Sequence, residues 1–208
     1  VRGYKMFYWL TILSDGGDFF NLFRYITFRA GGAFITSLIF GFIFGRPLIN
    51  LLRRRQGRGQ PIRTDGPEGH FSKAGTPTMG GALILGALVV STLLWARLDN
   101  MHIWVVLFVT VGFGAIGFAD DYAKVTKQTV VGVSGKLRLG LGFVIALVAA
   151  LAAAQLHPDG LSTQVAVPIL KDTLVPFGLL FFPFAMIVIV GTANAVNLTD
   201  GLDGLAIM

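Results

Sequence analysis

Five stretches of the chain are apolar over about the length that a helix needs to cross a lipid bilayer. Roughly twenty apolar residues span the hydrocarbon core as an α-helix. The stretches lie at about Ala30–Leu52, Met79–Leu98, Ile103–Phe118, Leu137–Leu156 and Leu174–Val196. The pattern therefore predicts an all-α polytopic integral membrane protein with about five transmembrane helices in this chain.

The remaining segments carry weaker patterns. A short apolar run, Met6–Leu13, is followed by Asp15 and Asp18 and lacks the cleavage site of a signal peptide. We predict that residues 1–29 form an extracytoplasmic, interfacial segment and that residues 30–208 form a transmembrane helical domain, which we expect to be incomplete at its C-terminus. In the loop before the fifth stretch, the alternating TQVAVPIL (163–170) predicts a short hairpin strand.

Composition agrees with a membrane protein, because 54% of the 208 residues are hydrophobic and only 13% are charged. The chain has no cysteine, which excludes disulfides and thiolate chemistry. Its net charge of +6 could indicate nucleic acid, but the basic residues gather in two loops, as the positive-inside rule describes. The first loop contains Arg46, Arg53, Arg54, Arg55, Arg58, Arg63 and Lys73, and the second contains Lys124, Lys127, Lys136 and Arg138. We therefore expect no nucleic-acid partner and a cytoplasmic position for both loops.

Three polar clusters then fall at helix ends on the predicted cytoplasmic side: KAGTPTMGG (73–81), ADDYAKVTK (119–127) and NAVNLTDGLDG (194–204). In the second cluster, Lys124 lies three and four residues after Asp121 and Asp120, so all three share one side of a helix. An ion pair at a helix end would explain them. Alternatively, one carboxylate serves Mg²⁺ while the lysine neutralises a phosphate.

NAVNLTDGLDG places Asn194, Asn197, Asp200 and Asp203 three positions apart. Each step of three drifts roughly 60° around an α-helix, so the four side chains cannot share one face unless the helix is interrupted. The glycine after each aspartate permits such a break, with the amides directed to a polar cavity and the carboxylates on a loop. The alternative is an ordinary helix cap followed by a polar turn.

KAGTPTMGG precedes the second stretch. Thr78 follows a proline and is predicted to be the N-cap of the second helix, while Gly80 and Gly81 would allow close approach of a ligand or a helix. Lys73 could bind anionic lipid, although a cap and small-residue packing would also explain the cluster. His70 is either an acid or base, or ordinary polar surface.

Converging helix ends would bring the carboxylates of the second and third clusters together and make them repel one another. A divalent cation and a positively charged neighbour would relieve this repulsion. We therefore predict that the acidic residues of these clusters hold a divalent metal ion such as Mg²⁺ and hydrogen-bond a polar substrate.

GTPTMGG, ADDYAK and NAVNLTDGLDGLA, in this order, resemble the motifs of the MraY-type phospho-N-acetylmuramoyl-pentapeptide transferase family, in the polyprenyl-phosphate N-acetylhexosamine 1-phosphate transferase superfamily. The similarity covers the chain from about Ala30 onward. It implies a Mg²⁺-dependent transfer of phospho-MurNAc-pentapeptide from UDP-MurNAc-pentapeptide to undecaprenyl phosphate, which yields lipid I and UMP in peptidoglycan synthesis. It also implies the bacterial cytoplasmic (inner) membrane, with the active site on the cytoplasmic side.

The resemblance implies roles for individual residues. Asp120, Asp121 and Lys124 match a DDxxK motif and would be catalytic, with both carboxylates near the metal and Asp120 the candidate base for direct attack by the lipid phosphate. The substrate-binding residues would be Lys73, Thr78, Asn194, Asn197, Asp200, Asp203, Lys136 and His70. Membrane lipids are a further expected partner, and the oligomeric state, including a homodimer, stays open.

Three alternatives also stay open. A related transferase acting on UDP-GlcNAc or another UDP-HexNAc would share DDxxK and the Asn/Asp motif, although GTPTMGG and NLTDGLDGL favour the muramoyl branch. A transporter would place its polar groups near the midplane of the membrane rather than at helix ends. A non-catalytic scaffold would tolerate Asp120→Asn.

The resemblance further implies a fold of about ten spanning helices, with acidic and histidine motifs after Met208. We therefore expect this chain to be an N-terminal fragment that is inactive by itself. Formation of lipid I by the purified 208-residue chain would contradict that expectation.

Overall fold

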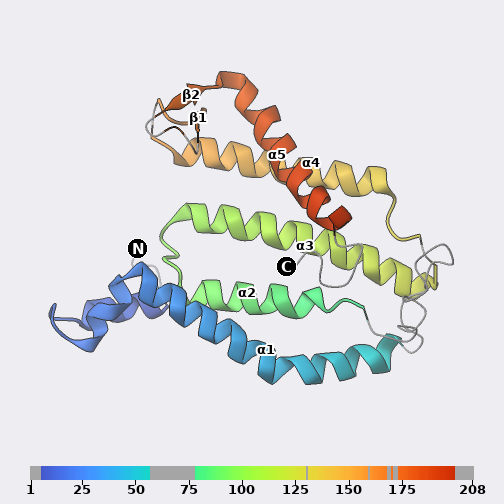
Figure 1. The fold of residues 1–208 in the computed structure, drawn as a ribbon, viewed down its shortest axis with the longest axis horizontal. Helices are drawn as coiled ribbons and strands as arrows, with labels where there is room; N and C mark the ends of the chain where they lie inside the picture. The colour runs from blue at the N-terminus through green and yellow to red at the C-terminus, as the bar shows by residue number, and fades with distance from the viewer. Residues whose placement is uncertain are drawn as a thin grey trace. The chain divides into compact units, whose positions relative to one another are not determined.

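The computed structural model describes residues 6–56, 78–129, 131–158, 160–167, 170 and 173–199. Helices dominate this part of the chain (Figure 1). Its α-helices are α1 (Ile26–Gln56), α2 (Gly81–Trp95), α3 (Met101–Lys127), α4 (Gly135–Leu156) and α5 (Phe181–Thr199). The shorter elements are the 3₁₀ helices η1 (Phe7–Leu13), η2 (Phe19–Arg24) and η4 (Gly178–Leu180) and the strands β1 (Gln164–Ala166) and β2 (Leu174–Pro176).

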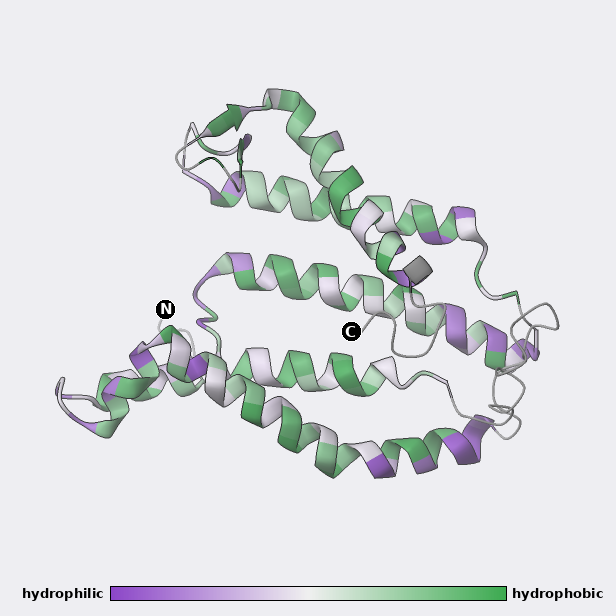
Figure 2. Ribbon diagram, in the orientation of Figure 1, coloured by the Kyte–Doolittle hydropathy of each residue, from purple (hydrophilic) through white to green (hydrophobic). Residues whose placement is uncertain are grey.

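Four helical segments in the described residues are long and apolar enough to cross a membrane. They are α1, α3, α4 and Gly178–Asn197, which contains most of α5. Figure 2 shows apolar residues along these helices and hydrophilic residues at one end of α1 and of α3. The fifth apolar helix, α2, is shorter, with 15 residues. The prediction of an all-α membrane protein with five apolar helices in this chain is confirmed.

Helix α2 is shorter than the predicted stretch Met79–Leu98 at both ends. Met79 has a φ of +73°, a left-handed conformation that cannot continue a helix. After Trp95 the backbone is extended at Ala96, and the next side chain, Arg97, pairs with Asp99 at 3.0 Å. The hydrogen bond that Arg97 donates to Asp99 raises the pKa of the guanidinium above its ordinary value.

Contacts divide the chain into two compact units, which we describe separately. One unit comprises Val1–Ile103 and Gly114–Ser134, and the other comprises Trp104–Phe113 and Gly135–Met208. Helix α3 therefore contributes residues to both units. The two 3₁₀ helices before α1 belong to the first unit, and their interfacial position stays a prediction.

In the first unit, Trp95 at the end of α2 anchors the packing against α1. Its ring stacks on Phe23 with 5.9 Å between centroids and meets Phe28 edge-on at 6.1 Å. The indole N–H donates to Thr36 Oγ1 on α1 at 2.9 Å, which satisfies the polar edge of the ring. A Cβ added to Gly32 would lie 2.5 Å from atoms of the Trp95 ring, so only glycine permits this approach.

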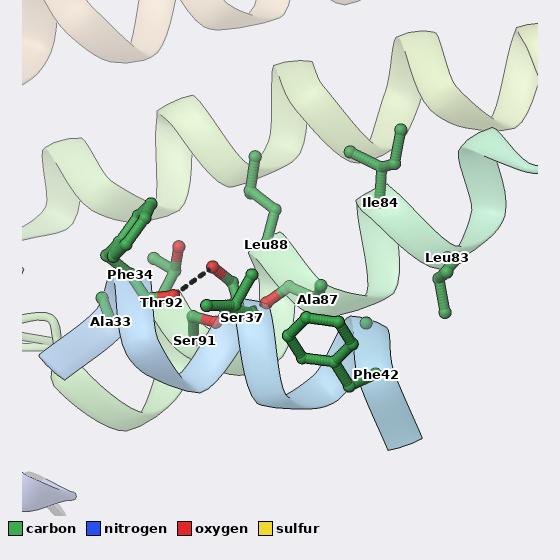
Figure 3. Close-up of a pocket in the computed structure, with 12 residues that line it drawn as sticks. Ala33, Phe34, Ser37, Phe42, Leu83, Ile84, Ala87, Leu88, Ser91 and Thr92 are labelled. Atoms are coloured by element: carbon green, nitrogen blue, oxygen red, sulfur yellow. Dashed lines mark hydrogen bonds between the residues drawn. The ribbon is translucent and has the colours of Figure 1, made fainter. Parts of the chain in front are cut away.

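A groove of about 690 Å³ also lies between α1 and α2 (Figure 3). Its lining is mainly apolar, as at Phe34 and Leu88, and contains no ionisable side chain. The hydroxyls of Ser37 and Ser91 donate to carbonyl oxygens of their own helices, those of Phe34 and Ala87. Since these hydroxyls are satisfied locally, the groove presents an apolar surface and none of the predicted catalytic groups.

In the second unit, small residues bring α4 close to its neighbours. Ala146, Ala149 and Ala150 are at most 3% exposed. A Cβ added to Gly142 would lie 3.3 Å from Phe113 and 3.8 Å from Val190 of α5. In lipid there is no hydrophobic driving force for helices to associate, so close van der Waals contact between small residues stabilises their packing.

The strands β1 and β2 form an antiparallel pair in which Val165 lies opposite Val175. The pair confirms the strand predicted in TQVAVPIL. It also corrects the predicted start of the fifth helix at Leu174, because Leu174–Pro176 forms β2 and α5 begins at Phe181. The backbone N–H and C=O groups that pair with β1 are not available for the hydrogen bonds of a helix.

We expect Gly32→Ala to destabilise the protein by about 1–3 kcal/mol, because the new methyl group would overlap the Trp95 ring and push α1 from α2. The measurement is the thermal unfolding temperature in detergent. Gly31→Ala is the matched control: a Cβ there meets nothing within 4 Å, so the same change should be neutral or slightly stabilising. Equal unfolding temperatures for the two variants would contradict the packing role of Gly32.

Candidate functional site

The polar centre of the first unit is a cluster of charged side chains in the last two turns of α3. Lys124 Nζ lies 2.7 Å from Asp120 Oδ2 and 3.8 Å from Asp121 Oδ1. These are the pairs that the DDxxK spacing predicts for one side of a helix. The Asp120 side chain is only 7% exposed and that of Lys124 20%, so the pair is largely removed from water. A buried carboxylate needs such a partner, because an unpaired charge in an apolar surrounding is costly.

The connection after α3 supplies a second partner for Asp120. The backbone N–H of Val133 donates to Asp120 Oδ1 at 2.8 Å. Gly132 permits this approach, because a Cβ there would lie 2.9 Å from both Asp120 Cγ and the Asp120 carbonyl oxygen. Each carboxylate oxygen of Asp120 is therefore held, one by an ammonium group and the other by a backbone amide.

Thr78 reaches the same cluster from the chain before α2. Its hydroxyl donates to Asp121 Oδ2 at 3.1 Å. This contact corrects the prediction that Thr78 caps α2: the helix begins at Gly81, Gly80 occupies the N-cap position, and no side chain caps the first turn. The left-handed Met79 separates Thr78 from the helix, so the hydroxyl is directed to α3 instead of to the first N–H groups of α2.

Gln56, the last residue of α1, completes the cluster and was not among the predicted site residues. Its side-chain amide donates to the Thr78 carbonyl oxygen at 3.0 Å and accepts from the Thr78 N–H at 2.9 Å. The residue is 8% exposed. In the sequence it follows three arginines that were interpreted as a topology signal, and no motif or spacing distinguished it.

The two aspartates thus have different surroundings. Asp120 is nearly enclosed, whereas the Asp121 side chain is 31% exposed and its Oδ1 is 3.8 Å from the lysine ammonium. No group of three or more acidic or histidine side chains that could hold a metal occurs in the described part of the chain. The partly exposed Asp121 carboxylate still fits Mg²⁺, which commonly takes one or two carboxylates from the protein and completes its shell with water and phosphate oxygens.

The other predicted site residues belong to the second unit or lie outside the part of the chain that the structure describes. Asn194, in α5, donates through Nδ2 to the Val190 carbonyl oxygen of its own helix at 2.8 Å. Asn197 is exposed in the same helix, and Lys136 is exposed in the first turn of α4. These three residues belong to the second unit. Lys73, His70, Asp200 and Asp203 lie outside the described residues.

Comparisons with known proteins match both halves of the chain. Residues 103–208 match the sequence profile of glycosyl transferase family 4, and residues 73–85, which include Thr78, match signature 1 of phospho-N-acetylmuramoyl-pentapeptide-transferase. A Ruegeria pomeroyi protein named phospho-N-acetylmuramoyl-pentapeptide-transferase is 73% identical over 203 residues, which cover 98% of this chain and 56% of that protein. A Dinoroseobacter shibae protein of the same name is 69% identical over 204 residues, with the same coverage. The chain therefore spans about half the length of these relatives.

We expect Lys124→Met to lower the stability of the protein by about 3 kcal/mol, because it leaves the buried Asp120 carboxylate without its ammonium partner. Adding Asp120→Asn should restore part of the unfolding temperature by removing the carboxylate that has lost its ammonium partner. Lys127→Met, at the exposed end of the same helix, is the matched control and should change little. A Lys124→Met variant as stable as Lys127→Met would contradict the charge compensation.

Proposed function

The chain belongs to glycosyl transferase family 4, and we propose that the full-length protein transfers phospho-MurNAc-pentapeptide from UDP-MurNAc-pentapeptide to undecaprenyl phosphate, forming lipid I and UMP. The observation that carries the proposal is the hydrogen bond from Thr78 to Asp121. It joins a residue of the matched transferase signature to the acidic pair on α3, so two motifs distant in sequence meet at one place. The names of the relatives support the same reaction class.

The reaction joins two anions, so its barrier is lowered mainly by positioning and by neutralisation of charge. An oxygen of the lipid phosphate attacks the phosphorus that carries the sugar, a new P–O bond forms, and the phosphoanhydride bond to UMP breaks. Lys124 can neutralise a phosphate with donors that its contact with Asp120 leaves available, since an ammonium group carries three. Mg²⁺ held at Asp121 would supply further neutralisation of the diphosphate when bound.

We assign the two carboxylates different tasks. Asp121 is the more exposed, and its Oδ2 is oriented by Thr78, which suits contact with a metal ion that in turn binds the diphosphate. Asp120 holds Lys124 and the loop at Val133 in place. To act as a base toward the lipid phosphate, Asp120 would first have to release one of these partners, so substrate contact is assigned first to Asp121.

The proposed location is the bacterial cytoplasmic (inner) membrane with the site on the cytoplasmic side. The apolar helices support a membrane protein, and the basic residues near the cluster's segments in the sequence support its cytoplasmic orientation. Asp120 lies in the last two turns of the 27-residue α3, which disfavours the transporter alternative with its midplane site. The proposed partners are UDP-MurNAc-pentapeptide, undecaprenyl phosphate and membrane lipids.

The test is lipid I formation by the full-length protein purified in detergent. We expect transfer from UDP-MurNAc-pentapeptide, little transfer from UDP-GlcNAc, loss of transfer with EDTA and recovery with added Mg²⁺. Asp121→Asn should lower kcat on the order of 100-fold, because it removes a charge that acts on the transition state. Asp99→Asn, in the exposed turn before α3, is the matched control and should leave kcat unchanged.

Preferred transfer from UDP-GlcNAc would favour the related UDP-HexNAc transferase instead. Full activity of Asp121→Asn would refute the assignment of the site.

A further inference from the structure

We infer that Gln56 is a positioning residue for the transfer reaction, one that fixes Thr78 against Asp121. The inference rests on the proposed function, because its role is to orient a carboxylate of that site. Gln56 lies on α1, Thr78 before α2 and Asp121 on α3, so the contacts tie three helices together at one end.

The geometry of the amide explains why glutamine suits this position. One side-chain amide meets both backbone groups of a single residue, donating to the Thr78 carbonyl oxygen and accepting from the Thr78 N–H. This is the pattern that an adjacent strand would provide. Because Gln56 is 8% exposed, both of its polar atoms need partners within the protein, and Thr78 supplies them.

The backbone groups of Thr78 need partners from another segment, because the hydrogen bonds of α2 begin after this residue. The first helical bonds of α2 are accepted by the carbonyl oxygens of Met79 and Gly80, so that of Thr78 lies outside the ladder. Met79, the next residue, has a φ of +73°. A non-glycine residue in this region is strained and persists only when its surroundings hold it in place. The Gln56 side-chain amide bonds the backbone of Thr78, the residue before Met79, and so helps to hold this conformation in place.

Because its backbone is fixed, Thr78 also holds its hydroxyl in place against the Asp121 carboxylate. The hydroxyl donates a hydrogen bond to Asp121 Oδ2, while Asp121 Oδ1 lies 3.8 Å from Lys124 Nζ. The two contacts set the rotation of the carboxylate and leave the Oδ1 side for a cation. Loss of the amide would let the segment at Thr78 shift, and the carboxylate would lose the donor that orients it.

Two substitutions distinguish hydrogen bonding by the Gln56 amide from a role in filling space. Gln56→Glu retains an acceptor for the Thr78 N–H but places a carboxylate oxygen against the Thr78 carbonyl oxygen. Gln56→Leu removes both bonds at similar size. Both changes should therefore impair transfer, whereas a role in filling space alone would be preserved by leucine.

The experiment is a double-mutant cycle on Gln56 and Thr78 in the full-length protein. We expect Gln56→Leu and Thr78→Val each to lower kcat about tenfold, with KM for the nucleotide substrate little changed. The double variant should also lose about tenfold, rather than the roughly hundredfold loss of two independent residues, because Gln56 acts through Thr78. Gln164→Leu and Thr110→Val are matched controls whose side chains donate to nearby carbonyl oxygens outside the site, and they should leave kcat unchanged.

Hydrogen exchange provides a readout that does not depend on activity. The Thr78 amide should exchange faster in Gln56→Leu than in the wild-type protein and stay protected in Thr78→Val, since that variant keeps the backbone bonds. Multiplicative losses in the cycle, or unchanged exchange and kcat in both Gln56 variants, would overturn the inference. If the wild-type protein showed no transfer from UDP-MurNAc-pentapeptide, the proposed function would fail, while the exchange rates would still decide whether Gln56 holds Thr78.

Discussion

The structure around the candidate site depends on one constraint: the Asp120 carboxylate is buried near the end of an apolar helix and must be compensated there. Lys124 provides the opposite charge from one turn further along α3, and the Val133 N–H provides a hydrogen bond from the following loop. In an apolar surrounding, either partner is worth more than it would be in water. The requirement therefore fixes the position of the lysine, brings the loop back onto the helix, and explains why Gly132 lies against the carboxylate.

The neighbouring carboxylate is arranged in a different way. Successive residues on an α-helix point about 100° apart, so Asp121 is offset from Asp120 and lies against Thr78 before α2 rather than against Val133. There it accepts from Thr78, whose backbone is held in turn by Gln56. One aspartate is thus committed to holding the site together, while the other is oriented and partly exposed. Such a division suits phosphoryl transfer, in which the protein positions anions and neutralises them.

The rest of the first unit gives this cluster a rigid support. Glycine at position 32 and the indole of Trp95 allow α1 and α2 to pack closely at the end opposite Gln56. The groove between the two helices is apolar and has no ionisable lining, so the charged cluster on α3 lies outside it. A membrane protein benefits from this separation, because polar groups at the ends of helices avoid the cost of burial within the hydrocarbon.

Sequence by itself determined the features that depend on local periodicity and composition. Five apolar helices, the hairpin strand before α5 and the shared side of Asp120, Asp121 and Lys124 all follow from spacing along the chain. Tertiary structure decided what depends on contacts between segments. Thr78 had the signature of a helix cap, but a left-handed Met79 and the amide of Gln56 turn it toward α3. The role of Gln56 could not be predicted from the sequence. A glutamine after three arginines acquires this role only when another segment places its backbone within hydrogen-bonding distance.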